Sequence, residues 1–267
     1  MFYRIIIILY FYMKFEMRLN MLVDYLANSI VYKKENYVDV EKTINKLLEN
    51  IEKAYNDLQT SEYPAKEWVE NENLMPFSQG NHKLPATTYI INLGTAGLCP
   101  GRALGNCNCR DICYAKNAET QYKENVINRR LLQTLRWRKL SAKEIAKQLL
   151  DKSDKALKNK MQYLRINESG DVFDQSDIKK MSDIADILAS RNVGTYTYSS
   201  RYDLDWSKKS DNLIVNGSGW ICDNSFIAVD EFTDDMMYRC SGECDTCSYC
   251  KEPAGRLIYV KVHGNGR

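Results

Sequence analysis

A strand, a capped helix and a second strand follow one another near the middle of the chain, and this order constrains the fold most. MQYLRIN (161–167) and VGTYTYS (193–199) are rich in β-branched and aromatic residues, as strands are. Between them, apolar residues recur at helical spacing from Ile178 to Leu188, with Ser176 as the predicted N-cap. Strands joined by such a helix run parallel, so the sequence predicts a parallel α/β sheet.

Other segments extend this pattern in both directions. TTYIINL (87–93) reads as a strand, and the helical pattern resumes over 114–137 and 142–151. Three more strands are predicted at 213–217, 225–229 and 257–262. The architecture is either an open sheet or a partial or complete (β/α) barrel. Before it, residues 21–60 carry an amphipathic helical pattern, so we expect an N-terminal helical extension over 1–77 and an α/β metal-binding domain over 78–267.

Eight of the nine cysteines fall into two tight groups, which leaves only Cys222 apart. The first group is Cys99, Cys107, Cys109 and Cys113, and the second is Cys240, Cys244, Cys247 and Cys250. Four thiolates so close in sequence can surround one soft metal centre, either zinc or an iron–sulfur cluster. Only two histidines are present, which excludes a histidine-rich zinc site and gives little support to Ser–His or Cys–His catalysis.

The cellular compartment decides between metal ligands and disulfides. The N-terminal apolar run Ile5–Tyr12 lacks a following small-residue cleavage site and is too short to span a bilayer. We therefore expect a cytoplasmic protein without membrane attachment, whose reduced thiols bind metal. With 37 Lys and Arg against 35 Asp and Glu, the net charge of +2 provides no electrostatic support for nucleic-acid binding.

The type of ligand favours an iron–sulfur cluster, with zinc as the alternative. All-cysteine ligation without histidine is typical of [4Fe–4S] clusters. Cys240, Cys244 and Cys247 have the C-x3-C-x2-C spacing of radical S-adenosylmethionine enzymes, although in those enzymes the motif follows the first barrel strand. S-adenosylmethionine is therefore a weaker cofactor prediction than the cluster itself. In the first group, Cys107 and Cys109 are only two residues apart, so all four thiols need not bind one metal.

The loops that follow the predicted strands hold the other candidate residues. In parallel α/β folds these loops meet at one edge of the sheet, where ligands bind. Glu168 and Asp171 are the catalytic candidates, although carboxylates here can also cap a helix or close a turn. The candidate ligand-binding residues are Ser169, Ser199, Ser200, Arg201, Asn216 and Ser218. Arg201 is the predicted anion-binding side chain, with a surface ion pair as its ordinary alternative.

The string NHKLPATTYIINLGTAGLCPGRALGNCNCRDICYAKNAETQY resembles the opening of the phage gene product 88 family. RINESGDVFDQSDI, TYTYSSR, IVNGSGW and the second cysteine group follow in the order of that family, so the resemblance covers about residues 78–267. It implies a phage or prophage protein in the bacterial cytoplasm, with Cys99, Cys107, Cys113 and the later cysteines as its signature. The family also implies little about biochemical activity.

Two functions from different classes remain. The first is an iron–sulfur enzyme, remotely similar to radical S-adenosylmethionine barrels, that acts on a small molecule or nucleotide. The second is a zinc- or cluster-stapled α/β module that binds nucleic acid or a host protein. Substitution of Glu168 or Asp171 separates them, because an enzyme would lose activity while it remains folded, whereas a stapled module would tolerate the change.

Overall fold

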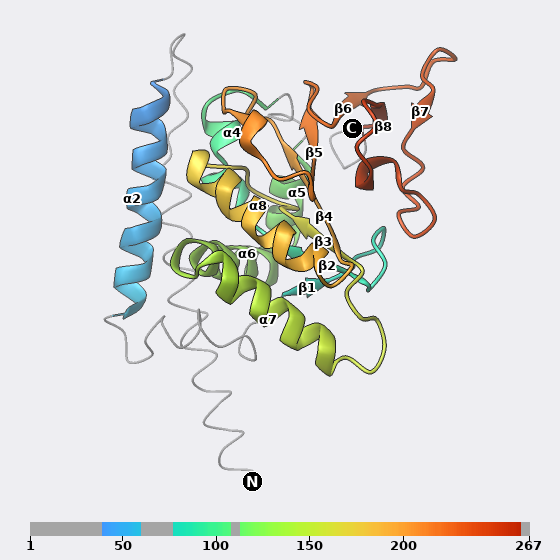
Figure 1. The fold of residues 1–267 in the computed structure, drawn as a ribbon. Helices are drawn as coiled ribbons and strands as arrows, with labels where there is room; N and C mark the ends of the chain where they lie inside the picture. Colours follow the sequence, from blue (N-terminus) through green and yellow to red (C-terminus); the bar gives the residue numbers. More distant parts are fainter. Residues whose placement is uncertain (1–38, 60–76, 108–112, 263–267) are drawn as a thin grey trace.

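The computed structural model describes residues 39–59, 77–107 and 113–262, and an eight-stranded sheet forms its centre (Figure 1). The strands are β1 (Ser78–Gln79), β2 (Thr88–Ile91), β3 (Tyr163–Ile166), β4 (Gly194–Ser199), β5 (Leu213–Ser218), β6 (Asn224–Val229), β7 (Tyr238–Arg239) and β8 (Leu257–Lys261). The helices are α2 (Val40–Gln59), α4 (Pro100–Ala103), α5 (Tyr114–Gln121), α6 (Lys123–Lys139), α7 (Ala142–Lys155) and α8 (Gln175–Ala189). Three 3-10 turns lie at Ala96–Leu98, Trp206–Lys208 and Tyr249–Lys251.

The strand order is β1-β2-β3-β4-β5-β6-β8-β7, and every neighbouring pair is parallel except β1 with β2. The predicted parallel α/β sheet is therefore confirmed. From β2 to β6 each strand lies beside the next one in sequence, as in a (β/α) barrel, and the order does not reverse as it does in a doubly wound sheet. Within the described residues the sheet ends at β1 and β7, so these strands form a barrel-like sheet with two edges.

One side of the sheet, here called the helix face, contains the hydrophobic core. Tyr89, Leu164 and Leu213 align across the strands on this side, and all three are buried. They pack with apolar side chains of α6, α7 and α8, and α8 contacts β4 and β5 directly. Figure 1 shows α8 lying along this layer, with α7 beside it.

The opposite side, here called the inner face, is polar and aromatic. Because side chains alternate along a strand, the positions between the core residues point the other way. The inner face comprises Tyr163 and Arg165 of β3, Tyr196 and Tyr198 of β4, Ile214 and Asn216 of β5, and Asn224 and Phe226 of β6. It lies under the C-terminal part of the chain, because the 3-10 turn Tyr249–Lys251 contacts β4 and β5.

Helix α2 belongs to the same core as the sheet. Its buried residues Ile44, Leu47 and Ile51 are part of the main apolar cluster, as the amphipathic pattern predicted. At the far end of the helix, Lys139 Nζ lies 4.1 Å from the ring centroid of Tyr55 and 2.7 Å from a carboxylate oxygen of Glu52. The predicted extension therefore packs closely on the α/β body, and its other parts lie outside the described residues.

Three details differ from the sequence expectations. The stretch 114–137 forms two helices, because Tyr122 leaves helical geometry (φ −126°, ψ 47°) between α5 and α6. Strands β1 and β7 were not predicted, since two residues are too few to show a periodic pattern. The predicted N-cap Ser176 is wrong: Asp174 caps α8, and its side chain accepts from the backbone N–H groups of Ser176 and Asp177. Asp174 precedes the helix in extended geometry, which capping requires, whereas Ser176 already lies in the first turn.

Removal of this cap should weaken α8. We expect Asp174→Ala to lower the free energy of unfolding by about 1 kcal/mol, because two backbone N–H groups lose their acceptor. Urea denaturation followed by circular dichroism measures the change. Asp174→Asn keeps a capping oxygen and should stay within about 0.5 kcal/mol of the parent. Equal losses for both variants would show that the cap contributes nothing to stability.

Candidate metal and ligand site

The first cysteine group lies where β2 leads into the helices, as predicted. Cys99 precedes α4 and Cys113 precedes α5, and both are free thiols. Burial raises the pKa of the Cys99 thiol, and the nearby Asp171 and Cys113 raise it further. Cys107 is disulfide-bonded, so it would act as a metal ligand only after reduction. Cys109 lies outside the described residues.

Asp171 connects the loops at the ends of β3 and β4. It accepts four hydrogen bonds: from Val172 N (2.8 Å) and Ser199 Oγ (2.7 Å) at Oδ1, and from Ser200 N (2.9 Å) and Ser200 Oγ (2.7 Å) at Oδ2. Gly101 packs directly on this group, since a Cβ added there would lie 2.0 Å from Ser200 Oγ. The carboxyl group thus has its acceptor positions filled and holds three segments together.

Asp171 should make the protein less stable as pH rises, which is the opposite of the usual effect of a carboxyl group. Burial raises the pKa of this carboxyl, against the opposing hydrogen bonds from Ser200 and Ser199. The folded protein therefore holds the proton to a higher pH than the unfolded chain does. The stability from this proton is fully present below the ordinary pKa of 3.8 and is lost as pH rises through the raised pKa.

We therefore expect the free energy of unfolding of the parent, relative to Asp171→Asn, to fall as pH increases from 3.8. Asparagine keeps the size of the side chain but does not titrate, so the difference between the two curves isolates this group. Urea denaturation at a series of pH values measures it. Parallel curves for the two proteins would contradict the raised pKa.

Arg201, the predicted anion-binding residue, is occupied by the protein itself. Its side chain is 2% exposed, and Nη1 donates to the carbonyl oxygens of Val172 (2.8 Å) and Phe173 (2.9 Å). Nε and Nη2 donate to the two carboxylate oxygens of Asp203, both at 2.8 Å. In this arrangement the guanidinium anchors the loop after β3 to the loop after β4, and four of its five N–H donors bond to the protein itself.

Glu168 and Ser169 occupy different positions in the loop after β3. Glu168 is half-buried, and its Oε1 accepts from Asn81 Nδ2 at 2.6 Å, while its backbone oxygen accepts from the Tyr114 hydroxyl. Ser169 is buried, and its backbone N–H donates to Asn92 Oδ1 at 2.7 Å. Of the two catalytic candidates, only Glu168 is therefore partly open to solvent.

A buried ion pair beneath this loop was missed by the sequence reasoning. Arg130 Nη1 of α6 lies 2.8 Å from Glu119 Oε1 of α5, and the same nitrogen donates to the carbonyl oxygen of Ala115. Glu119 Oε1 also accepts from the backbone N–H of Ala96 at 2.9 Å. The pair therefore fixes the first cysteine loop to both helices, and the break at Tyr122 lets α6 turn back toward α5.

The second cysteine group lies in residues 230–256, here called the cysteine segment. Cys240, Cys244, Cys247 and Cys250 are all free and half-buried. Burial raises the pKa of the Cys244 thiol, and Cys250 and Cys240 raise it further. No residue of the segment is buried, which means that it has no apolar core of its own.

Polar contacts attach the cysteine segment to the inner face. Asn216 Nδ2 donates to the carbonyl oxygen of Cys250 at 2.9 Å, and Asn224 Nδ2 donates to the carbonyl oxygen of Glu252 at 2.9 Å. Lys251 Nζ donates to the carbonyl oxygen of Cys244 at 2.6 Å. The predicted ligand residue Asn216 is thus fully buried and supports the cysteines from below. Ser218, at the end of β5, is half-buried and pairs with Phe226 of β6.

Tyr198 and Arg165 connect the cysteines to the sheet. Burial raises the pKa of the Cys250 thiol, and the nearby Tyr198 side chain lowers it. The guanidinium of Arg165 lies 4.8 Å from the ring centroid of Tyr198, and its charge also favours the Cys250 thiolate. The second group therefore has both a hydrogen-bond donor and a positive charge beside it.

Comparison with known proteins places the chain in a family. A sequence model of the family described as gene product 88 matches residues 33–220, more than half of the chain. The chain belongs to the gene product 88 family. No curated protein and no solved structure matches.

The match to the gene product 88 family covers one part of the candidate site and leaves out another. It begins before the expected residue 78 and includes the first cysteine group, the loops after β3 and β4, and the Arg165 region. It ends at residue 220, so the second cysteine group, which we had expected within the resemblance, lies beyond the matched range. In this member of the gene product 88 family, no helix among the described residues is long and apolar enough to cross a membrane.

In the described residues of this gene product 88 protein, the thiols are not arranged as a metal site. Among residues 39–59, 77–107 and 113–262, no three Cys, His, Asp or Glu side chains have the geometry of a metal site. The chemistry of the donors nevertheless fits a thiophilic centre, since four free thiols lie in one segment with a hydrogen-bond donor and a cation nearby.

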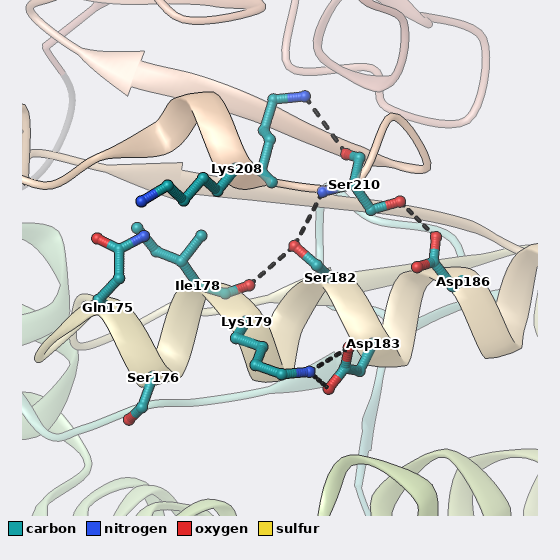
Figure 2. A pocket seen from close by; sticks show the side chains of 10 residues that line it. Gln175, Ser176, Ile178, Lys179, Ser182, Asp183, Asp186, Lys208 and Ser210 are labelled. Carbon is teal, nitrogen blue, oxygen red and sulfur yellow. Dashed lines mark hydrogen bonds and ion pairs between the residues drawn. The ribbon is translucent and has the colours of Figure 1, made fainter.

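A surface hollow of about 610 Å³ lies on the other side of the molecule, between α8 and the segment before β5 (Figure 2). Its polar groups bind one another. The backbone N–H of Ser210 donates to Ser182 Oγ at 3.0 Å, and Lys179 Nζ lies 2.7 Å from Asp183 Oδ2. Because α8 packs on the helix face, this hollow is separated from the inner face by the sheet. None of the predicted site residues lines it.

Proposed function

We propose that this protein is an iron–sulfur protein whose centre is bound by Cys240, Cys244, Cys247 and Cys250 against the inner face of the sheet, and that it acts as a cytoplasmic enzyme on a small molecule. The observation that supports this most is the position of Tyr198 and Arg165 beside the Cys250 thiol, where both oppose the rise in its pKa that burial causes. Donors to sulfur and nearby positive charge are the features by which proteins tune cluster potentials. A bound cluster would supply electron transfer or an open iron site.

The protein's own residues have separate tasks in this proposal. Asn216 and Asn224 hold the backbone of the cysteine segment, while Arg165 offsets the negative charge of four thiolates. Glu168 is the candidate for proton transfer at the rim, because it is half-buried and in contact with solvent. Asp171 instead positions the loops, since its oxygens are filled by hydrogen bonds from the protein. Activity of the radical S-adenosylmethionine type remains a prediction.

A zinc-stapled binding module is the second candidate. The observation that favours it is the absence of buried residues from 230–256, because a segment without a core needs a cross-link to keep one conformation. Zinc on four cysteines provides such a cross-link without any redox chemistry. The recognition of a host protein or nucleic acid would then belong to the surface that the staple maintains.

Anaerobic purification separates the two candidates. The protein should be brown, absorb broadly near ~400 nm as thiolate-bound clusters do, and contain iron and sulfide in matching amounts. A colourless protein with one zinc per chain would refute the iron–sulfur proposal and support the staple. A folded protein without iron or zinc would refute both.

A further inference from the structure

Arg165 lacks the carboxylate partner that comparable arginines have. Three other arginines with largely covered side chains form ion pairs: Arg130 with Glu119, Arg138 with Asp177, and Arg201 with Asp203. In the described part of the chain no such pair involves Arg165, whose Nε donates to the Asn167 carbonyl oxygen (3.1 Å) and whose Nη2 donates to the Tyr114 hydroxyl (3.2 Å). A largely covered charge without a carboxylate partner is costly, so Arg165 can still pair with an anion besides the Cys250 thiolate.

Tyr196 provides a second, independent sign at the same place. It lies directly opposite Arg165 in the β3–β4 pair, and its side chain is buried, at 1% exposure. Its hydroxyl has no hydrogen-bond partner among the described residues. Because the two residues are paired across neighbouring strands, the hydroxyl and the guanidinium lie on the same face of the sheet. A buried hydroxyl without a partner is rare in folded proteins and points to a group that binds there.

Arg165 and its neighbours are partly open to solvent. Tyr114 is 47% exposed, and Arg165 and Glu168 are half-buried. Glu168 influences Arg165 from farther away, but its Oε1 accepts from Asn81 Nδ2. Lys251 Nζ adds positive charge on the same face, 4.6 Å from the ring centroid of Tyr163. The charge and the donors here are therefore complementary to an anion.

We propose that Arg165 and Tyr196 bind the oxyanion group, carboxylate or phosphate, of a small ligand next to the cysteine segment. A planar guanidinium beside a hydroxyl donor matches the geometry of such groups. The proposal goes beyond the metal centre, because the two residues come from β3 and β4 and neither belongs to the cysteine segment. It also replaces Arg201 as the anion-binding residue.

Calorimetric titration of the purified protein tests the site, with inorganic phosphate in one series and acetate in the other. We expect saturable binding of at least one probe, and the probe that binds tells whether phosphate or carboxylate is preferred. Arg165→Gln should weaken that binding about tenfold or more, because it removes charge-assisted hydrogen bonds. Tyr196→Phe removes only a hydroxyl and should weaken it several-fold. Arg191→Gln, which removes an exposed arginine paired with Asp154, is the matched control and should not change affinity.

Metal content and circular dichroism are measured on the same samples. Binding that is lost in folded Arg165→Gln but retained in Arg191→Gln supports the site. The absence of saturable binding by the folded parent, with or without metal, overturns it, as does equal binding by the parent and folded Arg165→Gln. If Arg165→Gln does not fold, the titration of Tyr196→Phe decides, and unchanged affinity there overturns the proposal. Binding by a metal-free protein refutes only the metal centre, because the anion-binding residues lie outside the cysteine segment.

Discussion

The double variant Cys244→Ala/Cys247→Ala is expected to lose its metal and to expose the cysteine segment to protease. This is the largest local effect that we predict, because residues 230–256 contain no buried side chain and would depend on the metal for a fixed conformation. Structural metal sites contribute about 10 kcal/mol or more to the folding of small domains, so removal should raise the cleavage rate more than about a hundredfold.

Limited trypsin digestion measures this effect, since Arg239, Lys251 and Arg256 lie within the segment. The control is Cys222→Ala, which removes the thiol that belongs to neither cysteine group. Cys222 is half-buried beside the core, so this variant should keep both metal and protease resistance. The main unfolding transition should remain in both proteins, because the core lies on the helix face. Retention of full metal content by the double variant would show that these cysteines are not its ligands.

Removal of Glu119 should cause the largest loss of global stability. We expect Glu119→Gln to lower the free energy of unfolding by about 3–5 kcal/mol, because Arg130 would keep its charge in a buried position without a counter-charge. Urea denaturation measures the loss. The double variant Glu119→Gln/Arg130→Met should recover much of it, since the unpaired charge is then gone.

An exposed ion pair serves as the control for this experiment. Arg191 and Asp154 are separated by 3.0 Å, but both side chains are more than half exposed. Asp154→Asn should therefore change the free energy of unfolding by less than about 1 kcal/mol. If Glu119→Gln were as mild as Asp154→Asn, the buried pair would not be the support of the first cysteine loop that the structure indicates.

The sequence was sufficient to predict the sheet but not what covers its inner face. The six longer strands and the parallel order could be predicted because strand and helix periodicities alternate clearly from Thr88 to Lys261. The inner face could be predicted in part from the sequence. YLRI places Tyr163 and Arg165 two residues apart, and TYTYS does the same for Tyr196 and Tyr198. That alternation of aromatic and charged positions was the available signal for the Arg165 site.

The role of each loop residue could not be predicted, because it depends on contacts between distant segments. Arg201 and Arg165 look alike in sequence, yet one pairs with Asp203 and the other has no carboxylate partner in the described residues. Asp171 and Glu168 are three residues apart, yet one is enclosed by Ser199 and Ser200 and the other reaches solvent. Such differences arise from contacts between loops that are distant in sequence, as between Asp171 and Ser200, and no local pattern shows them.

The position of β8 between β6 and β7 has a consequence for synthesis on the ribosome. Strand β7 pairs only with β8 in the described sheet, and all four cysteines of the second group lie between these two strands in sequence. The helix-face layers can assemble while the chain is still being translated. Strand β7, however, has no strand to pair with in the described sheet until Leu257–Lys261 has emerged. The second cysteine group therefore reaches its place on the inner face after the other parallel strands, so a metal bound there, as proposed, would be delivered to a sheet that is otherwise complete.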